Sequence, residues 1–235
     1  FFKQKTAYEL GVRLVGSEMC IRDRFRTEGW GGRQPGTSLY HEEIRNRTVG
    51  IIGYGHIGKE IAKRAAAFDM RIIAIRRSQQ DAVAPLDWIG TADQLDKLLS
   101  ESDFVVVACD MNEDTIGMIG APQIAKMKPS SIIINVARGR IIAEEALYNA
   151  LKNKKISGAV LDVWYNYIGN DREKVSPSNL PFEQLDNVIL SAHESASAPE
   201  QVERRWKFVA ENICRATEGE TPKNIVFVGS EEAGN

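Results

Sequence analysis

Short apolar runs alternate along most of the chain with longer segments whose apolar residues recur at helical spacing. Short strands that are apolar on both faces and alternate with helices indicate a parallel sheet covered on both sides. The order βαβαβ, repeated once, predicts an α/β fold with a doubly wound parallel sheet. The expected strands are 49–52, 71–75, 104–108, 131–136, 159–161 and 187–191, and the expected helices are 56–69, 92–100, a single turn at 122–127, 143–152 and 199–216.

Three glycines, spaced Gly-x-Gly-x-x-Gly, stand between the first predicted strand and the first predicted helix. In that position the motif is typical of a dinucleotide-binding turn. Gly53 would make the tight turn, Gly55 would let the backbone approach a pyrophosphate, and Gly58 would let helix and strand pack closely. The N–H groups at the helix start, at His56 and Ile57, would face the anion. The sequence therefore predicts a Rossmann-type, dinucleotide-binding domain, with a glycine-rich turn that binds nothing as the alternative.

The residues after the second predicted strand bear on the choice of cofactor. NAD sites place an acidic residue there, on the ribose 2′-hydroxyl. This chain instead has Arg76, Arg77 and Ser78. Two guanidinium groups and a hydroxyl would suit a 2′-phosphate, so we expect NADP(H) to be preferred over NAD(H). A solvated basic turn with relaxed cofactor choice is the alternative.

The composition narrows the classes of partner. The 235 residues are 43% hydrophobic and 26% charged, which is ordinary for a globular protein. A net charge of −2 gives no reason to expect nucleic acid or acidic lipid as a partner, and no run approaches the roughly 18 apolar residues of a membrane span. Cys20, Cys109 and Cys214 have neither metal nor disulfide spacing, so no metal is expected and a reducing cytoplasm fits best. Cys109 and Cys214 lie in apolar runs and are expected to be buried.

The first 24 residues do not continue the pattern and lack the apolar core of a signal peptide. Residues 3–9 and 14–23 resemble the in-frame translation of a sequencing-library adapter, and 10–13 have the length of a barcode. We therefore expect 1–24 to be a non-native leader on a chain truncated at its N-terminus, with a genuine N-terminal arm as the alternative. The predicted organisation is a leader at 1–24, a connector at 25–47, a dinucleotide-binding domain at 48–197, and a C-terminal helix and tail at 198–235.

Three further motifs follow predicted strands: Asn135-Val-Ala-Arg138-Gly139, Leu161-Asp162-Val163 and Ala192-His193. With the glycine motif, they make residues 40–228 resemble the D-isomer-specific 2-hydroxyacid dehydrogenases. The resemblance implies an oxidoreductase that transfers a hydride between a nicotinamide cofactor and a 2-keto or 2-hydroxy acid. It also implies a substrate domain ahead of this segment, to which nothing but the connector corresponds, so we expect that domain to be missing.

The resemblance assigns roles to single residues. Arg138 matches the arginine that binds the substrate carboxylate and polarises the carbonyl, a task that suits a guanidinium fork. His193 matches the general acid and base. Asp162 matches the aspartate that meets the nicotinamide carboxamide, and Ala137 also falls in the cofactor site. The alternatives are a surface ion pair for Arg138, a structural role for His193 and a turn cap for Asp162.

The chain departs from the family at Tyr167, where members place the glutamate that pairs with the histidine. A carboxylate raises the pKa of a neighbouring histidine and orients its ring, whereas a tyrosine can do only the second. Some relatives, such as formate dehydrogenases, pair the histidine with glutamine, so activity need not be lost. The following loop offers four acidic residues as possible surrogates: Asp171, Glu173, Glu183 and Asp186.

Two other functions stay open beside the enzyme. A catalytically impaired module could bind a nucleotide and sense redox state, or the domain could serve as a dimerisation scaffold. Family members commonly dimerise through this domain, and four tryptophans could anchor an interface, so we expect a homodimer. With the substrate domain absent, residues 24–235 should bind cofactor weakly and show no meaningful turnover.

Overall fold

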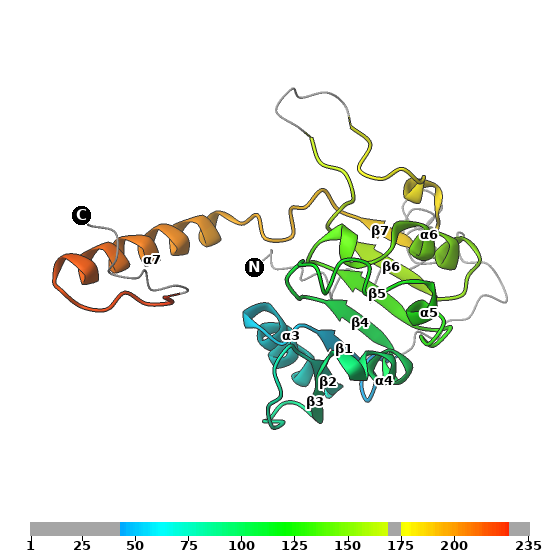
Figure 1. The fold of residues 1–235 in the computed structure, drawn as a ribbon, viewed down its shortest axis with the longest axis horizontal. Coiled ribbons are helices and arrows are strands. Elements are labelled where there is room, and N and C mark those ends of the chain that lie inside the picture. Colours follow the sequence, from blue (N-terminus) through cyan, green and yellow to red (C-terminus); the bar gives the residue numbers. More distant parts are fainter. Residues whose placement is uncertain (1–42, 169–174, 226–235) are drawn as a thin grey trace, which may run out of the picture. The chain divides into compact units, whose positions relative to one another are not determined.

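A parallel sheet of seven strands forms the centre of the first of two units, which extends to Ser195; the second unit spans Ala196–Asn235. The structure, a computed structural model, describes residues 43–168 and 175–225, and every element named below lies within them (Figure 1). The expected leader, the connector up to residue 42 and the end of the tail lie outside the described residues, as do Cys20, Asp171 and Glu173.

The strands follow the order β3-β2-β1-β4-β5-β6-β7, and every neighbouring pair is parallel. From β1 the chain builds outward to β3 on one side, then crosses to build β4 to β7 on the other, so the predicted doubly wound sheet is confirmed. Strand β3 was not predicted, because three residues at a sheet edge are too few to show a period. The strands are β1 (Thr48–Ile52), β2 (Arg71–Ile75), β3 (Trp88–Gly90), β4 (Phe104–Val107), β5 (Ile132–Asn135), β6 (Gly158–Leu161) and β7 (Val188–Leu190).

Each predicted helix is present, with shifted ends. The helix expected at 56–69 stops at Ala66 because the N–H groups of Ala67 and Phe68 bond to carbonyls only three residues back. The segment 92–100 begins as a 3-10 turn before it becomes α-helical. The helices of the first unit are α3 (His56–Ala66), α4 (Leu95–Glu101), α5 (Ala121–Ile124) and α6 (Glu144–Lys152), with 3-10 turns η2 (Ala92–Gln94), η3 (Gly139–Ile141) and η4 (Phe182–Gln184).

Two apolar clusters cover the two faces of the sheet. Within β2, Ile72 belongs to one cluster and Ile73 to the other, as the alternation of a strand requires. The first cluster includes Ala62 of α3, and the second includes Leu98 of α4 and Leu147 of α6. Burial on both faces explains why the strands read as continuous apolar runs.

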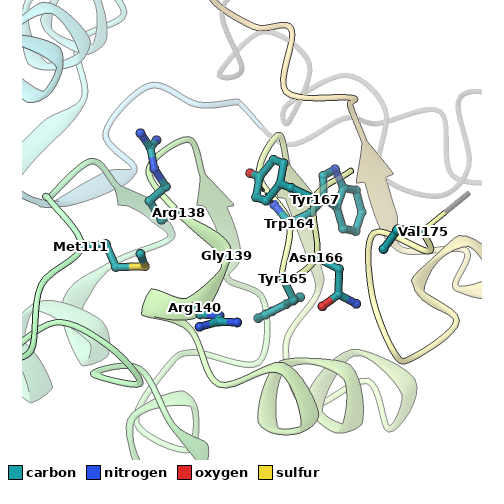
Figure 2. Close-up of a pocket in the computed structure, with 9 residues that line it drawn as sticks. All are labelled: Met111, Arg138, Gly139, Arg140, Trp164, Tyr165, Asn166, Tyr167 and Val175. Carbon is teal, nitrogen blue, oxygen red and sulfur yellow. Dashed lines mark hydrogen bonds between the residues drawn. The ribbon is translucent and has the colours of Figure 1, made fainter. Parts of the chain in front are cut away.

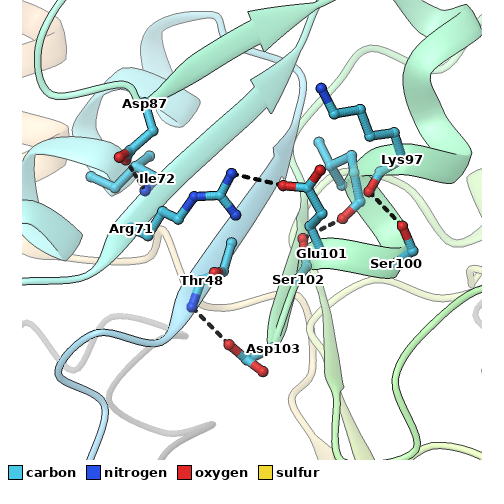
Figure 3. Close-up of polar contacts among 10 residues, drawn as sticks. Thr48, Arg71, Ile72, Asp87, Lys97, Ser100, Glu101, Ser102 and Asp103 are labelled. Atoms are coloured by element: carbon cyan, nitrogen blue, oxygen red, sulfur yellow. Dashed lines mark hydrogen bonds and ion pairs between the residues drawn. The ribbon is translucent and has the colours of Figure 1, made fainter.

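Polar contacts fasten the amino ends of the central strands (Figure 3). The Asp103 carboxylate accepts a hydrogen bond from the Thr48 backbone N–H (2.8 Å) and pairs with Lys128 Nζ (2.8 Å). Arg71 pairs with Glu101 at 2.7 Å. Burial by itself would raise the pKa of Asp103, but Lys128 and the Thr48 N–H outweigh it and hold that pKa below its usual value. These contacts lie at the edge opposite the glycine motif and leave the carboxyl edge open.

The second unit contains helix α7 (Pro199–Thr217), whose predicted apolar stripe is exposed, with two thirds of Trp206 accessible. Cys214 is also exposed, so its predicted burial is wrong: it lies on a helix whose described residues include no buried side chain. Cys109, after β4, is half-buried. Within the described residues, no helix is both long and apolar enough to cross a membrane.

Candidate functional site

Two glycines shape the turn from β1 to α3 because a side chain at either would meet backbone. Gly53 has a φ of +102°, and a Cβ there would lie 2.5 Å from the backbone nitrogen of Cys109. A Cβ on Gly58 would lie 2.3 Å from the Gly53 carbonyl oxygen. The close approach of α3 to β1 therefore depends on the absence of both side chains.

Gly55 differs, because nothing lies within 4 Å of the position its Cβ would take. It precedes α3, where His56 and Ile57 are exposed and the first turn carries no acidic residue. Among the described residues, no side chain caps this helix end. An open backbone surface at a positive helix end has the room and the charge to hold a pyrophosphate, so these residues fit the dinucleotide that the motif implies.

The basic turn after β2 lies beside the glycine turn. The Gly53 N–H donates to the Ile75 carbonyl oxygen (2.9 Å), which joins the ends of the two strands. The next residue, Arg76, is half-buried and donates to the Gln80 side chain, whereas Arg77 and Ser78 are exposed. Because this turn neighbours the glycine turn, it lies where the ribose of a bound dinucleotide would reach.

Asp162, at the end of β6, fixes the loop that follows β7. Its buried carboxylate accepts hydrogen bonds from Ser191 Oγ (2.7 Å) and from the backbone N–H groups of Glu194 (3.0 Å) and Ser195 (3.2 Å). The Ser195 hydroxyl donates to its other oxygen. This is the turn-cap role that the sequence left open, and contact between Asp162 and a nicotinamide stays a prediction. The serines carried no signal in the sequence, because the bonds span about thirty positions.

His193 lies in that fixed loop with a φ of +59°, an uncommon backbone conformation that tends to occur at functional sites. Its exposed ring lies 5.6 Å from the Tyr167 ring, centroid to centroid, with the planes inclined by 57°. The Tyr167 hydroxyl accepts a hydrogen bond from the Trp164 backbone N–H (3.2 Å), and the Trp164 indole donates to the Ser191 carbonyl (2.8 Å). The ends of β6 and β7 are thus tied together around His193.

The turn that carries Arg138 is fixed by its own motif. The Asn135 side chain donates to the Arg138 carbonyl (3.0 Å) and accepts from the Ala137 N–H (3.1 Å). A Cβ on Gly139 would lie 2.3 Å from the Trp164 carbonyl oxygen, so only glycine lets this turn pack against the end of β6. The asparagine and glycine of the motif therefore have structural tasks, while the Arg138 side chain is exposed and donates to the Ala137 carbonyl (2.7 Å).

Arg138 and Tyr167 lie on the wall of the same pocket, of about 490 Å³ (Figure 2). The two side chains come from the turns after β5 and β6, two neighbouring strands. The pocket is lined by Met111, Arg138, Gly139, Arg140, Trp164, Tyr165, Asn166, Tyr167 and Val175. A guanidinium, phenol and amide in one open pocket can bind a small anionic, oxygen-rich molecule.

Of the four acidic residues considered as surrogates for the glutamate, the structure describes Glu183 and Asp186, and neither pairs with His193. Asp186 pairs with Lys154, and it precedes β7, whereas His193 follows that strand. Glu183 is in η4, also ahead of β7, and is exposed. Within the described part of the chain, no group of three or more His, Cys, Asp or Glu side chains could hold a metal ion.

Comparison with known proteins places the chain among dehydrogenases. The family described as "D-isomer specific 2-hydroxyacid dehydrogenase, NAD binding domain" matches residues 16–195. That range begins inside the expected leader, whose boundary stays a prediction. Over 208 residues the chain is 36% identical to a glyoxylate reductase of Korarchaeum cryptofilum, covering 87% of this chain and 59% of the relative. It is 38% identical over 184 residues to a D-3-phosphoglycerate dehydrogenase of Methanocaldococcus jannaschii, covering 78% of this chain and 34% of the relative.

Solved structures give the same result. D-lactate dehydrogenase with NAD⁺ from Lactobacillus jensenii superposes with a TM-score of 0.75 at 26% identity, covering 94% of this chain and 66% of that one. An acyclic imino acid reductase in complex with NADPH and D-Arg gives 0.75 at 27% identity, covering 96% and 68%. The chain spans about three fifths of the length of the glyoxylate reductase and about a third of the length of the D-3-phosphoglycerate dehydrogenase.

Proposed function

This chain belongs to the D-isomer-specific 2-hydroxyacid dehydrogenase family, and on that premise we propose that it is part of an enzyme that interconverts a 2-keto and a 2-hydroxy acid. The observation that carries the proposal is the gathering of four features at one edge of the sheet. The glycine turn follows β1, the Arg138 turn follows β5, Asp162 follows β6 and the His193 loop follows β7. In open α/β sheets, ligands bind at that carboxyl edge.

The side chains suggest a division of labour. A bound nicotinamide would supply the hydride. Arg138, exposed on the pocket wall, would bind the substrate carboxylate and stabilise the charge that develops on the keto oxygen. His193 would give that oxygen a proton during reduction and take it back during oxidation. Asp162 would hold the His193 loop through the four bonds described above, and its contact with the carboxamide remains part of the proposal.

We also propose that NADP(H) is the preferred cofactor. Arg76, Arg77 and Ser78 lie beside the glycine turn and offer positive charge and a hydroxyl where a 2′-phosphate would reach. Arg76 would exchange its bond to Gln80 for one to the phosphate. The two similar solved structures hold one cofactor each, NADPH in the imino acid reductase and NAD⁺ in the D-lactate dehydrogenase, so the basic turn is what favours NADP(H) here.

A titration of the chain with NADPH and NADH, followed by quenching of tryptophan fluorescence, tests the cofactor site. We expect tighter binding of NADPH. Arg76→Asp should weaken NADPH at least about tenfold and leave NADH nearly unchanged, because one charge-assisted contact is worth about 1.5–3 kcal/mol. The matched control is Lys126→Asp, an equal charge reversal at an exposed site beyond α5. Equal or tighter binding of NADH would refute the preference, and binding of neither would refute the dinucleotide site.

A nucleotide-binding sensor without turnover is the second candidate, favoured by the tyrosine at position 167. An assay of 2-keto acid reduction decides between the two candidates. The protein assayed should also contain the part of the relatives that this chain does not match. Residues 24–235 alone should bind cofactor with little turnover, because a cleft shared by two domains excludes water only when both are present. The homodimer and the cytoplasmic location remain parts of the proposal. Light scattering tests the first.

A further inference from the structure

We propose that Tyr167 is a positioning residue for His193: its ring holds the imidazole in place but, unlike the glutamate of the family, supplies it with no carboxylate. The catalytic meaning of this inference rests on the proposed function, but the contact itself does not. The two rings lie 5.6 Å apart, within the range in which aromatic rings attract each other in inclined arrangements. Both residues are exposed, and the contact between their rings would limit how freely the imidazole rotates.

Tyr167 is itself held by the backbone. Its hydroxyl accepts a hydrogen bond from the Trp164 N–H (3.2 Å), three residues earlier, which turns the segment back on itself. Trp164 is buried, and its indole donates to the Ser191 carbonyl (2.8 Å), two residues before His193. Trp164 thus fixes the Tyr167 ring with one donor and the His193 loop with the other, so the two rings share a common anchor.

The loop is held on its other side by Asp162, through Glu194 and Ser195. His193 therefore has a fixed backbone before and after it, while its side chain touches Tyr167. This arrangement performs the orienting half of the task that the family gives to a glutamate. Because a phenol ring does not carry the charge of a carboxylate group, Tyr167 does not perform the electrostatic half.

Charged side chains lie on the three turns that follow β5, β6 and β7. Both carboxylate oxygens of Asp162 accept hydrogen bonds from the loop itself, and Glu194 adjoins His193 in sequence. Arg138 lies on the wall of the pocket that Tyr167 also lines. Across residues 43–168 and 175–225, no hydrogen bond or ion pair joins a carboxylate to the His193 ring. A carboxylate introduced at position 167 would place a negative charge beside the imidazole, and this charge would favour the protonated form of the ring.

NMR of the histidine ring signals in the full 235-residue chain tests this proposal without an activity assay. The chain has three histidines, and His193→Gln identifies the signal of interest. Tyr167→Ala should remove the ring-current shift of His193 and broaden its rotamer distribution, while Tyr167→Phe should keep most of that shift. Tyr167→Glu should move the midpoint of the His193 titration to higher pH by roughly one unit. Ile168→Ala, at an exposed neighbour, is the matched control and should change none of these.

Far-UV circular dichroism checks that each variant folds, and Tyr167→Phe retains a test if the alanine variant does not. The proposal is overturned if Tyr167→Ala in a folded chain leaves the His193 shift unchanged, or if Tyr167→Glu leaves its titration midpoint unchanged. Failure of the proposed function gives a different result: neither NADPH nor NADH binds, while the Tyr167 variants still move the His193 signal.

Discussion

Replacing Gly58 and Gly55 by alanine, one at a time, separates the packing of α3 from the binding of a dinucleotide. A Cβ on Gly58 would lie 2.3 Å from the Gly53 oxygen, about 1 Å short of an ordinary contact, and 3.2 Å from Ile51 Cγ2. The first atom belongs to the backbone and cannot rotate away, so α3 has to move off the sheet. Overpacking of this kind costs about 1–3 kcal/mol, and the better helix propensity of alanine returns up to about 1 kcal/mol.

We therefore expect Gly58→Ala to lower the free energy of unfolding by about 1–2 kcal/mol. Gly55→Ala should change it by less than about 1 kcal/mol, since φ of −88° and ψ of −155° suit alanine and the space is open. The same added methyl would occupy the surface that a pyrophosphate needs. Gly55→Ala should thus weaken NADPH binding about tenfold or more, because a clash of 1.4 kcal/mol already gives a factor of ten.

Urea unfolding followed by circular dichroism measures the first quantity, and quenching of tryptophan fluorescence by NADPH measures the second. Each variant serves as the control for the other, since the mutations are the same size and three residues apart. Unchanged NADPH affinity in Gly55→Ala would refute the placement of the pyrophosphate at this helix end. Unchanged stability in Gly58→Ala would refute the packing argument.

Three further predictions concern the groups around this site and the opposite edge of the sheet. Asp103→Asn should lower stability at pH 7 by about 1–3 kcal/mol in urea unfolding, because its bond to Lys128 and its charge are lost. Since the folded-state pKa of Asp103 is lowered, that difference should be full above the unfolded value near 4 and should disappear as the pH falls through the folded value. Asp162→Asn should speed amide hydrogen exchange at Glu194 and Ser195 more than elsewhere in the sheet, and unchanged exchange there would contradict its role as the loop's anchor. Burial raises the pKa of Cys109 to about 11, so iodoacetamide at pH 8 should modify exposed Cys214 well before it, as peptide mass spectrometry can measure.

The sequence predicted most of the fold because burial on both sheet faces leaves a strong local signal. Runs such as 72–75 and 104–108 are apolar throughout, and polar residues lie close to both ends of each run, so these strands could be predicted without knowledge of their contacts. Strand β3 escaped because its pairing with β2 decides its conformation, and three residues carry no period. The end of α3 also depended on hydrogen bonds rather than on composition.

For the candidate site, the sequence supplied the chemistry, and the structure supplied the partners. The glycine spacing and Arg138 could be predicted locally, since Gly53 directly follows β1 and Arg138 stands three residues after the end of β5. The anchoring of the His193 loop by Asp162 and the contact between His193 and Tyr167 could not, because they join residues 26 to 33 positions apart. The burial expected for Cys214 failed for a related reason, since an apolar stripe shows which face of a helix could be covered and not whether anything covers it.

By itself, then, the sequence determined six of the seven strands, the turn that must lack side chains, and the groups that can bind an anion or carry a proton. These follow from backbone geometry and side-chain chemistry within a few residues. Only the tertiary structure decided that the Asp162 carboxylate accepts hydrogen bonds from the loop of His193 and that Tyr167 lies against the imidazole. Hydrogen bonds and ring contacts act over a few ångströms in space, and the chain brings such groups together only after the strands have paired.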